Sequence, residues 1–262
     1  MLFKKKEQTS GRPEESQVIR RLHCLRAVLV VGYSPPFEYL KGEILSRLPQ
    51  KEAEEAVEVL EAKVREAWVE LRQADAWNEL SPTERELSVT PYKDVSPRQQ
   101  INAMWRIEAF GVLMWALRLV PNLLPGDVPA ELDKLQPIGK PSLRPAPEID
   151  LARDVAETWH WRCRTQQLVR DGYKFEATPQ MLKAGIKSLD DIVRQTAKLA
   201  HQNGDLPQIV DEDWSVFGKA FRDLDPDEYS NITSMCVERH YALNWLCGRA
   251  PGNRWDETPT DT

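Results

Sequence analysis

Three segments carry the full set of residues that starts an α-helix, and this pattern constrains the fold more than any other feature of the chain. The segments are Ser81-Pro82-Thr83-Glu84, Ser96-Pro97-Arg98-Gln99 and Asp225-Pro226-Asp227-Glu228. Each supplies a capping oxygen, a proline at the first helical position and a Glu or Gln that can bond back to the cap. Thr178-Pro179 supplies the cap and the proline only.

Apolar residues recur with helical spacing after these starts, so the sequence predicts an all-α, multi-helix fold. The predicted helices span residues 15–31, 37–47, 51–77, 82–88, 97–120, 147–170, 179–201 and 226–247. Alternation of apolar and polar residues between Trp214 and Phe221 leaves room for at most a small β-hairpin.

The longest segment without a predicted helix is rich in proline. Seven prolines fall within the 27 residues from Pro121 to Pro147, which forbids a long helix and favours an extended connection along the surface. A domain linker is one interpretation. The helices on both sides, however, carry more apolar surface than a lone half could cover. We therefore predict a single helical domain over residues 14–262, preceded by a disordered leader over residues 1–13.

Charge and composition exclude several classes of partner. The 262-residue chain has a net charge of −6, which argues against general binding to nucleic acid phosphates and favours a basic protein partner. The longest uncharged apolar run, Ala109 to Leu117, is half of a membrane span, and the leader lacks the apolar core of a signal peptide. Four scattered cysteines are typical of reduced thiols. We expect a cytoplasmic protein that does not bind membranes.

One predicted helix carries a heptad seam. Val57, Leu60, Val64, Ala67 and Leu71 follow each other at spacings of three and four on an otherwise Glu-rich segment. A coiled-coil dimer is one reading, and packing inside a bundle is the other. The oligomeric state, monomer or dimer, stays open.

Two charges lie inside a helix that is apolar on nearly every side. Arg106 and Glu108 are about 200° apart around that helix, so they cannot pair with each other and need partners elsewhere. The segment Glu238-Arg239-His240 supplies candidates, and the simplest arrangement pairs Arg106 with Glu238 and Glu108 with Arg239.

This cluster has two interpretations. The first is a buried ion-pair network that fixes how the helices pack. The second is an active site in which His240, flanked by carboxylates, acts as an acid or base, with Glu108 and Glu238 as further catalytic candidates. Asn244 lies on the same helix face as His240 and belongs to the candidate cluster.

A metal site is the third possibility. Cys236 and His240 are four residues apart, and His160 and Cys163 are three apart, so two helices could assemble a Cys2His2 zinc site. Zinc-binding sequences usually show tighter clusters, and the chain lacks the common nucleotide, nucleophile and metalloprotease motifs. We expect no metal and no cofactor.

The C-terminus is unusual for a chain end because it keeps Trp255, Asp256 and Asp261. Chain ends are normally polar and frayed, so we predict that Trp255 is buried against the body. Asp256 or Asp261 should then bond to backbone amides or to an arginine such as Arg239.

These motifs resemble those of a bacterial family of unknown function, numbered 4272. The resemblance rests on Trp105-Arg106-Ile107-Glu108-Ala109, the segment from Glu238 to Leu246 and the terminus from Trp255, and it spans residues 16–262. It implies no activity. Two features depart from the family pattern: Arg118 stands where members tend to have glycine, and residues 179–201 look like an insertion.

Our leading hypothesis is therefore a non-enzymatic, cytoplasmic protein-binding protein of the immunity or adaptor type. It rests on the acidity of the chain and the missing catalytic motifs. The alternative is a small-molecule enzyme or sensor whose pocket is lined by the Arg/Glu/His cluster and the terminal aspartates.

Overall fold

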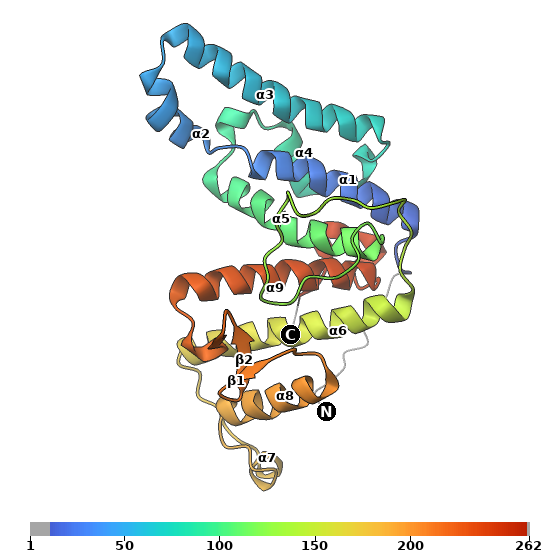
Figure 1. The fold of residues 1–262 in the computed structure, drawn as a ribbon, viewed down its shortest axis with the longest axis vertical. Coiled ribbons are helices and arrows are strands. Elements are labelled where there is room, and N and C mark those ends of the chain that lie inside the picture. Colours follow the sequence, from blue (N-terminus) through green and yellow to red (C-terminus); the bar gives the residue numbers. More distant parts are fainter. Residues whose placement is uncertain (1–10, 261–262) are drawn as a thin grey trace.

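The computed structural model describes residues 11–260, and it is a stack of helices. The helices are α1 (Glu15–Gly32), α2 (Phe37–Tyr39), α3 (Gln50–Gln73), α4 (Pro82–Val89), α5 (Pro97–Ala116), α6 (Ala146–Arg170), α7 (Pro179–Lys183), α8 (Leu189–Asn203) and α9 (Pro226–Leu246). α3 packs on α1, α1 on α5, α5 on α9 and α9 on α6, with α8 at the far end (Figure 1). The all-α prediction is confirmed.

The strands within residues 11–260 form one small antiparallel sheet. Its strands are β1 (Ile209–Val210), β2 (Asp213–Val216) and β3 (Lys219–Ala220), in that spatial order. The hairpin of β2 and β3 lies where the sequence predicts one, and β1 adds a strand. Every residue of β2 is buried, and β1 and β2 pack on α8.

The predicted helix starts are confirmed. Ser81, Ser96 and Asp225 all form complete capping boxes, and Thr178 accepts a bond from the backbone of Met181. The predicted single helix over 179–201 is wrong. Gly185 takes a left-handed φ of 79° after α7, and Ser188 then starts α8 with its own capping box to Asp191.

Three apolar clusters fill the stack. One lies between α1 and α3, a central one joins α1, α5 and α9, and a third joins α6, α8, α9 and the sheet. The seam of α3 packs inside the protein from Val64 to Leu71, as the bundle reading expects. No helix in residues 11–260 is long and apolar enough to cross a membrane.

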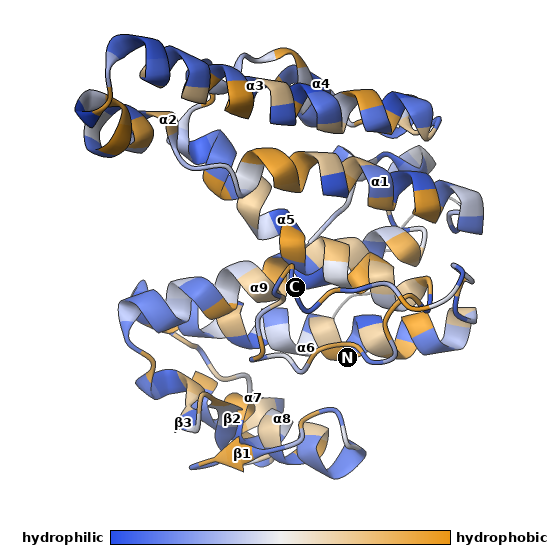
Figure 2. Cartoon of the chain, turned by 45° about the horizontal axis from the view of Figure 1, so that its top comes forward, coloured by the Kyte–Doolittle hydropathy of each residue, from blue (hydrophilic) through white to orange (hydrophobic). Residues whose placement is uncertain are grey.

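The closest helix crossing, between α1 and α5, depends on a glycine. A Cβ atom at Gly32 would lie 2.5 Å from the backbone nitrogen of Met104, so only glycine lets the two backbones approach this closely. Hydropathy colours in Figure 2 mark many residues of α1 and α5 as apolar. This pair forms the wall of the site described below.

The proline-rich connection between α5 and α6 lies against the body, as predicted. Backbone amides of Ile138, Ser142 and Arg144 donate to carbonyl oxygens at the end of α5. Ala130 and Leu135 are buried in the central cluster. In Figure 1 the connection runs across α5 and α9 before it enters α6.

The predicted disordered leader covers residues 1–13. Residues 1–10 lie outside the described residues. Pro13 is buried, and Arg12 forms an ion pair with Asp150 of α6, so the end of the predicted disordered leader is docked. The single-domain boundary, residues 14–262, stays a prediction.

Helix α5 ends at Ala116, four residues before the predicted end, because Arg118 takes a left-handed φ of 57°. The amide of Arg118 donates to the carbonyl of Trp115, and that of Leu119 to the carbonyl of Met114. This is the Schellman arrangement that glycine normally completes. It explains why glycine is the expected residue at this position.

Replacing Arg118 with glycine is therefore expected to stabilise the protein. A side chain with a Cβ atom destabilises this left-handed conformation by about 1 kcal/mol or more. Removing that strain should raise the melting temperature by roughly 2 to 4 °C. Arg118→Ala is the matched control because it also removes the long contact with Glu148 but keeps the Cβ atom. Thermal unfolding by circular dichroism measures both; equal melting temperatures for the two variants would contradict the explanation.

Candidate functional site

The two predicted ion pairs are both present. Glu108 Oε2 lies 2.7 Å from Arg239, and Glu238 Oε2 lies 2.9 Å from Arg106. The first pair is buried, with side-chain exposures of 1% for Glu108 and 8% for Arg239. Arg106 and Glu238 are only partly buried, at 22% and 17%, so the expectation that Arg106 is buried is wrong.

Glu108 and Arg239 hold the proline-rich connection in place. Glu108 Oε1 accepts a bond from the backbone amide of Ala130 at 2.9 Å. Arg239 Nη1 donates to the carbonyl of Pro125 at 2.7 Å, and Nη2 donates to that of Val128 at 2.6 Å. With Nε on Glu108, all three guanidinium nitrogens of Arg239 donate inside the protein. The pair fastens the connection to α5 and α9.

His240 is not flanked by carboxylates, contrary to the acid–base hypothesis. Its side chain is fully buried, Nδ1 lies 3.0 Å from Nδ1 of His160, and Nε2 lies 3.0 Å from Nδ2 of Asn244. The charged groups that act on His240, Arg153 and Arg249, are cationic. The zinc alternative places His160 and His240 on facing helices, and the structure brings these two side chains together.

The partners of Asn244 fix the proton positions in this group. Arg153 can only donate, so it bonds Oδ1 of Asn244, and the carbonyl of Pro259 accepts from Nδ2. Nδ2 therefore also donates to His240 Nε2, and the single ring proton of His240 sits on Nδ1, where it donates to His160. Burial, followed by the charges nearby, lowers the pKa of His240 to about 3.

The four residues considered as zinc ligands come together in the structure as two separate pairs. His160 faces His240, and Cys236 hydrogen-bonds Cys163. Within residues 11–260, no three His, Cys, Asp or Glu side chains converge in a way that could hold a metal ion. The hydrogen bond with the Cys163 thiol, and then burial, raise the pKa of Cys236, which keeps that sulfur protonated.

The C-terminal tail is docked as predicted for Trp255 and Asp256. Trp255 is buried, and its ring lies 5.0 Å from that of Tyr241 and 5.3 Å from that of Trp245 between centroids. Asp256 Oδ2 accepts bonds from the backbone amide of Thr83 at 3.1 Å and from its hydroxyl at 2.7 Å. Asp261 lies outside the described residues.

Asp256 thus places a carboxylate at the N-terminus of α4, where free amides and the helix dipole favour negative charge. Asp256→Ala is expected to lower the free energy of unfolding by about 1 kcal/mol, as loss of a cap does. Glu257→Ala is the control, because Glu257 forms an ion pair with exposed Arg254, and it should leave the free energy of unfolding nearly unchanged. Urea unfolding of both variants tests this; equal curves for Asp256→Ala and the wild type would remove the anchoring role.

The residues that sequence reasoning missed line a groove between α1, α5 and the connection. Its volume is about 720 Å³. The apolar lining includes Leu22, Leu29, Phe110, Met114, Leu119 and Leu135. Tyr33 and Leu132, at 46% and 42% exposure, leave apolar surface open at its edges. This volume is within the range of small-molecule sites.

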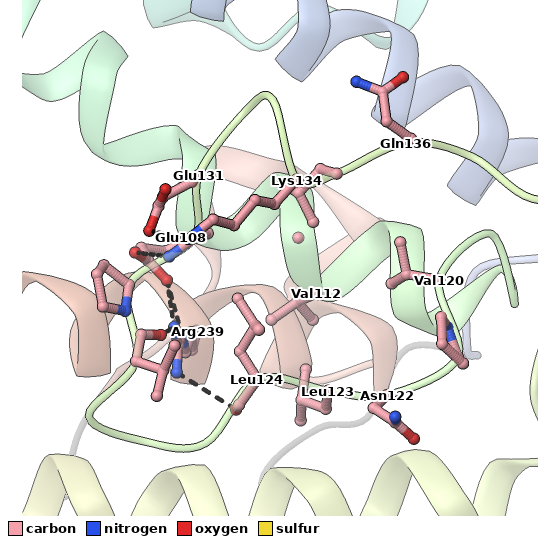
Figure 3. Close-up of a pocket in the computed structure, with 16 residues that line it drawn as sticks. Glu108, Val112, Val120, Asn122, Leu123, Leu124, Glu131, Lys134, Gln136 and Arg239 are labelled. Carbon is pink, nitrogen blue, oxygen red and sulfur yellow. Dashed lines mark hydrogen bonds and ion pairs between the residues drawn. The ribbon is translucent and has the colours of Figure 1, made fainter.

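A second cavity of about 300 Å³ lies under the same connection and shares Leu135 and Gln136 with the groove. Figure 3 shows Val112, Leu123 and Leu124 around it, with Glu108 and Arg239 at one end. Lys134 and Glu131 lie near each other at its rim and form an ion pair of 2.7 Å. Because the Glu108–Arg239 pair bonds to the connection, the polar end of this cavity offers a ligand few free donors.

A family model described as a domain of unknown function, DUF4272, matches residues 50–180. The chain belongs to this family. No curated protein and no solved structure matches the chain. The DUF4272 segment contains α3 to α6, hence Glu108 and the whole proline-rich connection. Arg239 and the C-terminal tail lie outside the matched segment, although they bond directly to residues within it.

Proposed function

We propose that this DUF4272 protein is a non-enzymatic, cytoplasmic binding protein that takes the apolar part of a small molecule into the groove between α1, α5 and the proline-rich connection. The observation that carries the proposal is the groove itself, an open volume of about 720 Å³ with a largely aliphatic and aromatic lining. Sites that bind small molecules are concave and mostly apolar, with few charged groups.

The state of the polar cluster supports binding over catalysis. A general acid or base must reach the proton it transfers, and both ring nitrogens of His240 already have partners inside a fully buried environment. The oxygens of Glu108 accept bonds from Ala130 and Arg239. These groups hold the connection and tail, and thereby shape the groove without lining its apolar wall.

The proposal predicts binding of a neutral apolar probe. N-phenyl-1-naphthylamine should bind with a rise in fluorescence. Leu22→Trp, which fills the groove, should weaken the affinity at least tenfold. Val89→Trp is the control, since it adds the same ring at a 75% exposed position outside the groove and should leave affinity unchanged. Absence of binding to the wild type, or equal affinity in both variants, would overturn the proposal.

A basic protein partner is the second candidate, and the surface of α3 favours it. Glu52, Glu55, Glu58, Glu66 and Glu70 are exposed on this helix, and hydrophilic residues dominate its outer side in Figure 2. The negative charge of these glutamates would attract a cationic partner toward α3. Glu66 and Glu70 also line the cleft between α1 and α3 beside the groove, whereas Glu52, Glu55 and Glu58 line neither that cleft nor the groove. A partner bound at these three residues would leave the groove open.

A further inference from the structure

Cationic side chains gather on the side of the groove that adjoins the cleft between α1 and α3. His23 and Arg26 of α1 and Lys63 of α3 line both the groove and that cleft, and Glu66 and Glu70 line the cleft alone. No carboxylate lines the groove. This is unusual in a chain with a net charge of −6, where a random surface concavity should meet acidic residues more often than basic ones.

These cations are poorly neutralised by the protein. Among the described residues, Lys63 has no hydrogen bond or ion pair, and the one ion pair of Arg26 is a 3.9 Å contact with exposed Glu70. Burial and the Arg26 charge lower the pKa of His23, so Arg26 and Lys63 supply the charge at neutral pH. Two cations with little neutralising charge from the protein lie beside the apolar groove. This arrangement suits a molecule with an apolar body and one negatively charged end.

We propose that the ligand is an amphipathic monoanion of the fatty-acid type, with its carboxylate between Arg26 and Lys63 and its chain along Leu22, Leu29, Phe110 and Met114. The inference rests on the proposed groove function and adds its chemical class. The chain buries methylene groups against the apolar wall, and the carboxylate stays near solvent where both cations reach it. Because Arg26 and Lys63 are exposed, their contribution depends on salt.

The alternative occupant of an apolar groove is a helix of a partner protein. The charge pattern favours the small anion, because the cations lie together where the groove adjoins the cleft between α1 and α3, and no other charged residue lines the groove. An amphipathic helix would lay an apolar face along the whole length of the groove, and its binding would not require two cations close together. Binding of decanoate itself therefore separates the two.

The test is competition of decanoate and 1-decanol against N-phenyl-1-naphthylamine on the full chain. The two competitors share a chain length and differ in charge. We expect decanoate to bind about tenfold more tightly in low salt, with the preference shrinking as potassium chloride is added. The double variant Arg26→Glu/Lys63→Glu should abolish the preference while the neutral probe still binds.

Lys51→Glu/Arg65→Glu is the matched control, since it makes the same change in net charge on α3 outside the groove. It should keep the preference for decanoate, and melting curves of both variants check folding. Equal binding of decanoate and 1-decanol to the wild type, or an unchanged preference in Arg26→Glu/Lys63→Glu, would overturn the inference and leave the groove function standing. Failure of the neutral probe to bind would remove both.

Discussion

Replacing Glu108 with alanine is expected to lower the free energy of unfolding by about 3 to 5 kcal/mol. The change leaves the buried Arg239 guanidinium without its counter-ion and removes the acceptor of the Ala130 amide. Breaking one side of a buried pair is costly because the remaining charge stays desolvated. Equilibrium urea unfolding measures the loss.

Glu238→Ala is the matched control for that experiment. It breaks the Arg106–Glu238 pair, which joins the same two helices but is partly exposed. Water can solvate the freed Arg106, so the expected loss is about 1 kcal/mol. Equal losses of unfolding free energy in the two variants would show that the Glu108–Arg239 pair does not hold the proline-rich connection in place.

Acid should destabilise the protein through His240 well above the pH at which most carboxylates protonate. The pKa of this buried side chain is about 3 in the folded state, against 6.5 for an ordinary histidine. The unfolded chain therefore binds a proton that the folded chain excludes. The stability from neutral His240 is complete above pH 6.5 and is lost as pH falls toward 3, by about 1.4 kcal/mol per pH unit.

His160 acts in the same direction, because burial and then the Arg164 charge lower its pKa as well. Urea unfolding at pH 7.5, 5.5 and 4.5 gives the slope for the wild type and for His240→Gln. The variant should show a slope shallower by about one proton. His201→Gln is the control, because His201 lies on α8 and bonds the Leu206 carbonyl away from the pair. Identical slopes for His240→Gln and the wild type would contradict the assignment.

Local chemistry accounts for what the sequence predicts well. Capping residues act within one helical turn, so Ser81, Ser96 and Asp225 mark helix starts without any knowledge of the fold. The free-energy cost of an unpaired buried charge also applies in any fold. It led to Glu108 and Arg239 as partners, although they are 131 residues apart. The burial of Trp255 follows the same logic for a large apolar ring.

What the sequence did not reveal depends on how helices lie side by side. The 179–201 segment has a helical pattern on both sides of Gly185, and only the left-handed turn there separates α7 from α8. His160 and His240 meet because α6 packs on α9, as the zinc alternative requires, but the sequence does not show that they form a pair separate from the Cys163 and Cys236 thiols. The groove combines α1, α5 and a connection whose path is set by the Glu108–Arg239 pair. No periodicity in the sequence encodes such a concavity.

The position of a bound ligand tests the central claim most directly. Methyl NMR spectra of the full chain, titrated with N-phenyl-1-naphthylamine, would locate the aromatic probe through its ring-current shifts. We predict saturable shifts at Leu22, Leu29 and Met114, which line the groove, and none at Val89 or Leu182, which lie elsewhere on the surface. Saturable shifts confined to residues outside the groove, or no shifts at saturating probe, would contradict the account.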